Sequence, residues 1–258
     1  MTGALKRIML ALGLPILLLA IWWLTTSNST SYYWPPLHDV LGRFDDVWLH
    51  GRFRADVLPS LARLLAGYGV ALVCGIAAGV VIGWSRGVRA FFEPILEFFR
   101  AVPPPLLIPV VMLFAGAGDQ MKVIVIATGC LWPVLLNTVE GVRGVDPVVL
   151  DTARSYRLRL HARVFQVALP SAGPAIAAGA RQALSIGIIL MVISEMFAAN
   201  NGLGFTLIEF QRTFSIPEMW TGILLLGVIG VALVAVFRLI ESRALRWYIG
   251  SRKASRAR

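Results

Sequence analysis

Residues 151–170 read Asp-Thr-Ala-Arg-Ser-Tyr-Arg-Leu-Arg-Leu-His-Ala-Arg-Val-Phe-Gln-Val-Ala-Leu-Pro, a basic stretch between two hydrophobic segments. Asp146-Pro147 opens the region, and proline is favoured in the first turn of a helix. The pattern predicts a helix from Val148 to about Val167, which Leu169-Pro170 then stops. Its partial apolar face, flanked by arginines, fits either a surface of anionic lipid headgroups or a groove on a partner protein.

The composition around this stretch is that of a membrane protein. Of the 258 residues, 57% are hydrophobic and 15% are charged, and the mean hydropathy is +0.75. A soluble domain carries about 25% charged residues. Six apolar runs each approach the roughly 20 residues that cross a bilayer as a helix. We therefore expect one all-α transmembrane domain over residues 1–258, with spans at about 8–24, 58–84, 91–115, 123–139, 172–195 and 220–240. The first run has no small-residue cleavage site, which favours an uncleaved span over a signal peptide.

The net charge of +10 reflects the membrane topology of the chain and does not indicate nucleic-acid binding. If the N-terminus is cytoplasmic, 16 of the 24 lysines and arginines fall on the cytoplasmic side and 6 outside. The positive-inside rule then predicts that both termini are cytoplasmic. The loop 141–171 and the basic tail 241–258 lie on that side too, where membrane lipid is an expected partner.

The third run contains four prolines, at positions 103, 104, 105 and 109. Proline removes a backbone donor, and broken backbone at membrane depth is tolerated only against protein or a water-filled cavity. We therefore expect this run to face the interior, with Arg100 and Pro104 as candidates for a polar pathway. A kink that serves packing alone is the alternative.

Two charges stand in the fifth run, Arg181 and Glu195. Charges inside spans usually face a cavity or a partner, so both are candidates for the pathway. Arg181 also fits a packed interface, and Glu195 also fits a helix cap or a hydrogen bond to a loop. In the second run, Gly75, Gly79 and Gly83 share one helix face, which suits close packing within the chain or a seam between two copies. The two cysteines lie in apolar runs, and no metal site is expected.

The spacing of the basic stretch resembles the cytoplasmic signature loop of ABC importer permeases. That pattern is Glu-Ala-Ala, three residues, Gly, nine residues, then Ile-x-Leu-Pro. Here Asp151-Thr152-Ala153 stands for the first triplet, Arg157 occupies the glycine place, and Val167-Ala168-Leu169-Pro170 closes the pattern. Arg157 departs from the family pattern, in which glycine permits a turn between two short helices; an arginine there either lets the helix continue or forces a costly left-handed residue. Thr152 in place of alanine is a second departure.

Four further segments resemble the nitrate/sulfonate/taurine branch of this family. They are Ala153-Arg-Ser-Tyr, Arg100-Ala-Val-Pro-Pro, Gly116-Ala-Gly-Asp, and Glu195-Met with Asn201-Gly-Leu-Gly. Phe114-Ala115 departs from the Trp-Phe that relatives often carry. The resemblance implies a type I importer permease fold in a prokaryotic cell membrane, and a small, anionic solute such as a sulfonate, nitrate or taurine.

The resemblance also implies an assembly. It consists of a second permease copy, two ABC ATPase subunits and an extracytoplasmic binding protein. ATP and magnesium belong to the ATPase, because this chain has no Gly-x-x-x-x-Gly-Lys-Ser/Thr loop and needs no cofactor of its own. The residues implied in ATPase coupling are Asp151, Thr152, Ala153, Arg154, Ser155, Arg157, Leu158, Phe165, Leu169 and Pro170. Among them, Ala153, Leu158 and Phe165 are predicted apolar anchors.

Two other classes of membrane protein compete with this interpretation. The transmembrane component of an energy-coupling-factor vitamin transporter also docks on ATPases, through helices that carry Ala-Arg-Ser. Ala153-Arg154-Ser155 matches one such element, but no second copy is present. An integral membrane enzyme would need paired carboxylates or clustered histidines within the spans, whereas all three histidines fall in loops.

Overall fold

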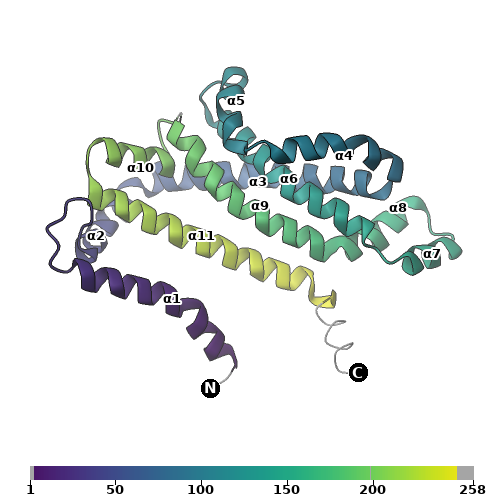
Figure 1. Ribbon diagram of the computed structural model, residues 1–258, viewed down its shortest axis with the longest axis horizontal. Coiled ribbons are helices and arrows are strands. Elements are labelled where there is room, and N and C mark those ends of the chain that lie inside the picture. The colour runs from purple at the N-terminus through teal and green to yellow at the C-terminus, as the bar shows by residue number, and fades with distance from the viewer. Residues whose placement is uncertain (1–2, 198, 249–258) are drawn as a thin grey trace.

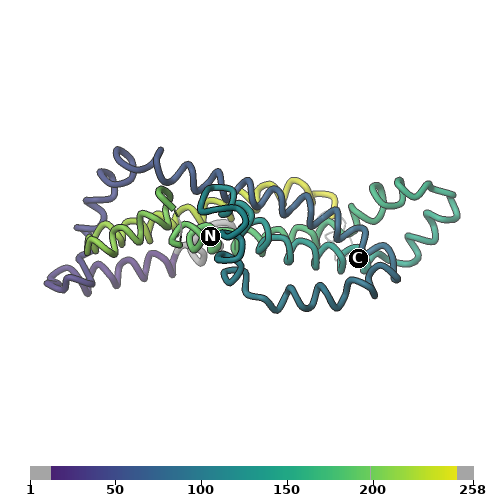
Figure 2. Tube along the Cα trace, turned by 90° about the horizontal axis from the view of Figure 1, so that it is seen from above, coloured from purple at the N-terminus to yellow at the C-terminus, as the bar shows by residue number. Residues whose placement is uncertain are grey.

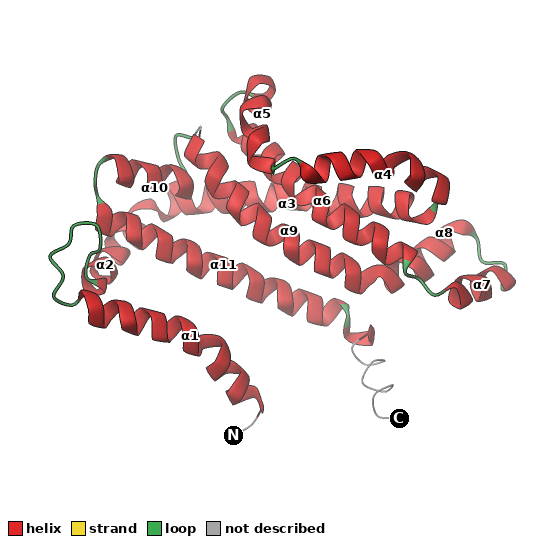
Figure 3. Ribbon diagram, viewed as in Figure 1, coloured by secondary structure: helices red, strands yellow, loops and turns green. Residues whose placement is uncertain are grey.

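The computed structural model describes residues 3–197 and 199–248, with side chains described from residue 13 onward. Every regular element within these ranges is helical (Figures 1 and 3). In chain order the elements are α1 (Gly3–Thr26), α2 (Leu37–Phe44), η1 (Asp45–Val57), α3 (Leu58–Trp84), α4 (Arg86–Ala101), η2 (Pro104–Leu106), α5 (Leu107–Ala115), α6 (Asp119–Arg143), α7 (Pro147–Ser155), α8 (Leu160–Ala162), η3 (Arg163–Ala168), α9 (Leu169–Phe197), α10 (Leu203–Arg212) and α11 (Ile216–Ala244).

Four helical stretches are long and apolar enough to cross a membrane. They are Leu37–Trp84, Asp119–Arg143, Leu160–Phe197 and Ile216–Ala244, and they contain the predicted spans 58–84, 123–139, 172–195 and 220–240. The predicted span 8–24 lies in α1, which is apolar over Gly13–Thr26. The cytoplasmic tail predicted over 241–258 begins in the last turn of α11, and its residues 249–258 lie outside the described ranges.

The core is built from α3, α6 and α9, which lie side by side along most of their length. Glycines of α3 face side chains of α6 in the same order along both helices, so these two helices run parallel. A Cβ atom added at Gly75 would come within 2.9 Å of Val134, and one at Gly79 within 2.6 Å of Thr138. The glycine stripe therefore serves close packing within the chain, one of its two predicted roles.

The α9 helix runs antiparallel to α6 and closes the core from the other side. Gly179 faces Pro133 and Asn137, whereas Gly187 faces Cys130. α11 lies outside α9 and α10, and α1 stands apart from the core in Figure 1. Three tryptophans bring α1, the loop after it and α11 together: Trp22, Trp34 and Trp220 have ring centroids 5.0–5.6 Å apart.

The third predicted span, 91–115, is not one helix. α4 begins at Arg86 and meets the η2–α5 segment at 83°, with the break at Val102 and Pro103. Prolines at 103, 104, 105 and 109 explain the break, because each removes a backbone donor. Within this chain most of its side chains are exposed, and Phe91, Phe98, Leu113 and Phe114 are between 65% and 87% exposed. That this run faces protein or a water-filled cavity rather than lipid stays a prediction. α5 projects away from the other helices in Figure 1 and therefore points toward the viewer in Figure 2.

Two π-helical segments each end directly before a Leu-Pro pair. The Leu58 N–H donates to the Phe53 carbonyl, and the Leu169 N–H donates to that of Val164, both five residues back. A proline ring clashes with the carbonyl four residues before it, and a widened π turn removes this clash. The helix therefore continues through Leu169-Pro170, and the prediction that this pair stops it is wrong.

The glycine contacts give a test of the core. We expect Gly79→Ala to destabilise the protein by about 1–3 kcal/mol, because the added methyl group overpacks the contact with Thr138. Gly69→Ala in the same helix is the control, because nothing lies within 4 Å of its Cβ position. Unfolding of purified protein in mixed micelles measures both variants. Equal stability of the two would contradict the packing described.

Candidate functional site

The basic stretch forms a compact helical hairpin rather than one long helix. Asp146 caps α7 by accepting a hydrogen bond from the Val148 N–H at 2.8 Å. The chain turns at Tyr156 and Arg157, and helix resumes at Leu160. The predicted continuous helix over 148–167 is therefore wrong.

Arg157 makes this turn in a left-handed conformation, with φ +52°. The Arg157 N–H donates to the Arg154 carbonyl at 2.8 Å, and the Leu158 N–H donates to that of Ala153 at 3.1 Å. This pair of bonds is a Schellman motif, whose left-handed residue is usually glycine. Arg157 thus keeps the geometry that the family pattern assigns to glycine, at a cost of about 1–2 kcal/mol for the crowded Cβ.

The residues implied in ATPase coupling divide between surface and core. Ala153 is buried at 5% exposure, and with Leu158 it closes the turn. Leu169 is half-buried at the start of α9. The others lie at the surface: Asp151, Thr152, Arg154, Ser155, Arg157, Leu158, Phe165 and Pro170.

The exposed apolar surface of the hairpin lies beside the turn. A shallow hollow of about 450 Å³ is lined mainly by Val148, Val149, Tyr156, Leu158 and Val167. Val148 is 69% exposed and Tyr156 79% exposed. Both follow the α7 periodicity, but the sequence did not single them out as anchors because they fall outside the apolar face assigned to a longer helix.

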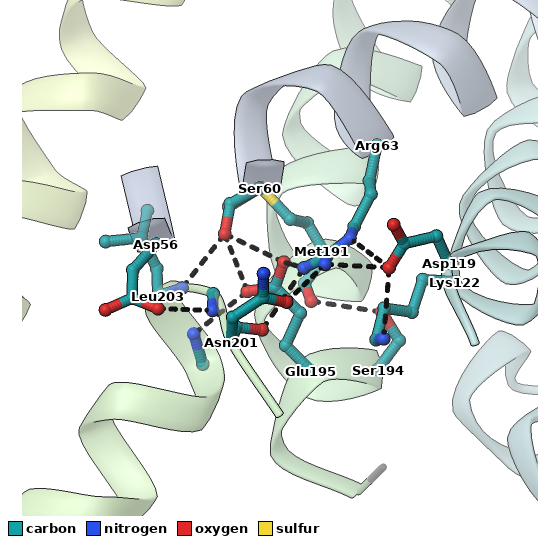
Figure 4. A network of polar contacts seen from close by, with 12 residues as sticks. Asp56, Ser60, Arg63, Asp119, Lys122, Met191, Ser194, Glu195, Asn201 and Leu203 are labelled. Carbon is teal, nitrogen blue, oxygen red and sulfur yellow. Dashed lines mark hydrogen bonds and ion pairs between the residues drawn. The ribbon is translucent and has the colours of Figure 1, made fainter. Parts of the chain in front are cut away.

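A second candidate site lies at the opposite end of the core, where Arg63 and Glu195 form a buried ion pair (Figure 4). The Arg63 Nη1 lies 2.8 Å from Glu195 Oε1, and their side chains are 4% and 0% exposed. Ser60 donates to both carboxylate oxygens of Glu195, at 2.7 and 2.8 Å. The Gly204 N–H adds a bond of 3.0 Å. Glu195 therefore caps the first turn of α10, as one interpretation of the sequence proposed, and both its oxygens are satisfied.

The same arginine reaches the start of α6 and the loop after α9. Its Nη2 lies 2.7 Å from Asp119 and 2.6 Å from the Asn201 side chain. Lys122 lies 3.5 Å from Asp119 and is buried. Two cations thus meet two carboxylates, and the network joins α3, α6 and α9.

Backbone geometry fixes the loop that closes this network. Gly202 has φ +117°, and a Cβ there would lie 2.5–2.6 Å from the Glu195 carboxylate. At Gly204 the nearest atom, the Val192 carbonyl oxygen, would lie 2.2 Å away. Segments 116–119, 195–196 and 201–204, which carried the branch resemblance, therefore converge in space. Arg63 and Lys122 are two of the six charges that the charge count assigns to the outside, and the structure buries them within α3 and α6.

The remaining pathway candidates lie apart from this network. Arg100 is exposed on α4, 3.5 Å from Glu97. Pro104 packs near Gly129 of α6. Arg181 of α9 pairs with Glu241 of α11, as expected of a packed interface. Among the described residues no cluster suited to a metal ion is present.

The strained turn gives a testable prediction. We expect Arg157→Gly to stabilise the protein by about 0.5–1 kcal/mol, because glycine removes the Cβ crowding but adds unfolded-state entropy. Arg159→Gly is the control: it removes the same charge from an ordinary φ of −61° and should destabilise by about 0.5–1 kcal/mol. Denaturant titration measures the free energy of unfolding of both variants. An Arg157→Gly variant less stable than the wild type would contradict backbone strain at Arg157.

The buried ion pair gives a second prediction. Glu195→Gln should destabilise the protein by on the order of 3 kcal/mol, because it leaves Arg63 without one of its carboxylates in the core. Glu209→Gln is the matched control, since Glu209 and its partner Arg52 are 38% and 33% exposed, and its cost should stay below about 1 kcal/mol. Similar melting temperatures for the two variants would show that burial does not raise the cost of breaking the ion pair.

Comparison with known proteins agrees with this architecture. A putative aliphatic sulfonates transport permease protein of Bacillus subtilis is 28% identical over 242 residues, which cover 93% of this chain and 87% of that protein. A taurine transport system permease protein of Escherichia coli is 27% identical over 250 residues, covering 94% and 91%. A chain of the MetNI methionine ABC transporter, solved in inward-facing conformations, has the same fold with TM-score 0.62 at 21% identity, covering 75% of this chain and 94% of that one.

The family model of binding-protein-dependent transport system inner membrane components matches residues 71–246. This range contains the bent pair, the hairpin and the α6–α9 half of the core. The comparisons give no support to an energy-coupling-factor component or a membrane enzyme. The chain belongs to the family of inner membrane components of binding-protein-dependent transport systems and is a multi-pass permease subunit of an ABC importer.

Proposed function

We propose that this permease imports a small organic anion of the sulfonate or taurine type, driven by an ATPase that docks on the α7–α8 hairpin. The observation that carries the docking proposal is the exposed apolar hollow around Tyr156 and Val148. Apolar side chains on an otherwise basic loop suit a protein groove, in which aromatic residues contribute most of the binding free energy. The surrounding arginines set register and attract an acidic rim.

The second arm of the hairpin is joined to the core without a break in the helix. Leu160–Phe197 forms one continuous helical stretch, so the second arm of the hairpin is an extension of a core helix. Closure of two ATPase subunits, which carry the ATP and magnesium, would then move α9 relative to its surroundings. This arrangement requires the hairpin and both termini to be cytoplasmic, as the distribution of arginines favours.

A second copy of the permease would complete the pathway. The exposed apolar side chains of α4 and α5 need a cover in the assembled transporter. Arg100 and Pro104 lie at the bend of this arm, where a positive charge would favour an anion. The two relatives named for sulfonates and taurine support an anionic solute, delivered by an external binding protein.

Reconstitution of the chain with the ATPase and binding protein encoded beside it tests this proposal. We expect ATP-dependent uptake of taurine or an alkanesulfonate into proteoliposomes. Tyr156→Ala should weaken association with the ATPase by about thirtyfold, the effect of losing a central aromatic anchor, and should abolish uptake.

Trp247→Ala is the matched control for that variant, because it truncates an aromatic side chain that is 52% exposed near the end of the chain. It should leave ATPase association unchanged. Normal association of Tyr156→Ala would refute docking at the hollow. Uptake of neutral solutes alone, with normal docking, would refute only the substrate class.

A further inference from the structure

A cavity of about 430 Å³ lies where the α3–α4 turn, the end of α6 and the hairpin meet, at the right-hand end of Figure 1. Five arginines from four different segments of the chain line it: Arg86, Arg89, Arg143, Arg154 and Arg163. Like charges at this density repel one another, so an anion bound in the cavity would relieve their repulsion. None of these five arginines lines the docking hollow.

The carboxylates near this cavity do not neutralise it. Glu140 lies 2.8 Å from Arg143, and Asp151 lies 2.8 Å from Arg154, both as exposed pairs within one helix. Among the described residues no carboxylate forms an ion pair with Arg86, Arg89 or Arg163. The Nε of Arg163 is buried without a hydrogen-bond partner. Three guanidinium groups are thus left for a ligand.

An apolar groove of about 670 Å³ continues from the cavity along α3. Trp84 lines both. Arg163 belongs to the cavity, whereas the next two residues, Val164 and Phe165, belong to the groove. The far side of the groove is formed by α3 side chains that include Ala77 and Val81. The combined site has a cationic end and an apolar end.

We propose that this combined site binds an anionic phospholipid, with the phosphate among the arginines and an acyl chain along α3. Basic pockets between transmembrane helices suit such headgroups, and guanidinium groups bind phosphate oxygens through paired hydrogen bonds. A soluble anion would leave the apolar groove empty. A second copy of this chain, whose net charge is +10, would bring further cations rather than the anion that the cavity requires. The bound lipid joins the hairpin to the ends of α3 and α6.

The test counts retained lipid by native mass spectrometry, with the full chain released from nanodiscs that contain equal amounts of phosphatidylglycerol and phosphatidylcholine. The wild type should retain phosphatidylglycerol selectively. The variant R86Q/R89Q/R163Q should bind it on the order of a hundredfold more weakly, through loss of three arginine contacts. The control R238Q/R243Q/R246Q removes the same charge from the end of α11 and just beyond it, and should retain the lipid.

A second variant separates a lipid from a free oxyanion. Ala77→Trp fills the apolar groove and leaves every arginine in place, so it should lose phosphatidylglycerol. Inorganic phosphate alone should not raise the melting temperature of the wild type in detergent. Stabilisation by phosphate with no effect of Ala77→Trp would overturn the lipid assignment in favour of a free anion. Equal lipid loss in both triple variants would show that lipid retention depends on general surface charge, and it would overturn the proposed site. Because the measurement is made without transport, its failure leaves the proposed function untouched.

Discussion

Arg63 places a full positive charge inside a helical core, and the end of the core opposite the hairpin is organised around that charge. A buried guanidinium is tolerated only with carboxylates and hydrogen bonds around it. Glu195 of α9 and Asp119 of α6 supply the carboxylates, and Asn201 fills the remaining side. Because the three partners come from different parts of the chain, satisfying one arginine fixes the relative positions of three helix ends. The glycine at 202 follows from this requirement, since any side chain there would collide with the carboxylate.

The other end of the core follows a different rule, in which backbone geometry rather than charge sets the shape. The hairpin turns at a left-handed residue and returns to helix through a widened turn before Pro170. Both features direct the chain and lower its local stability. Both lie in the segment that the proposed ATPase would contact. Strain at a functional segment is a common arrangement in proteins.

The sequence predicted most of the spans because hydrophobic length is a local property. It also predicted broken backbone at the prolines of the third run, because the effect of a proline on its own helix is local too. It failed where neighbours far along the chain decide the outcome. Arg63 and Lys122 look like loop charges until their partners are known, and those partners lie on other helices. The continuation of the helix through Pro170 depends on a hydrogen-bond shift that composition does not reveal. The signature spacing marked Arg157 as a departure from the family pattern, but the sequence predicted a continuous helix there, and only the backbone showed the left-handed turn.

The uninterrupted stretch from Leu160 to Phe197 has a mechanical consequence. A helix rises about 1.5 Å per residue, so this stretch extends over more than 50 Å along the helix, which exceeds the roughly 40–45 Å depth of a bilayer with its headgroups. One end is an arm of the hairpin and the other end carries Glu195, within hydrogen-bonding distance of Arg63 and Ser60. If an ATPase docks at the hairpin as proposed, a displacement applied there would pass along a single helical stretch to the buried ion pair, so both ends of the core would move together.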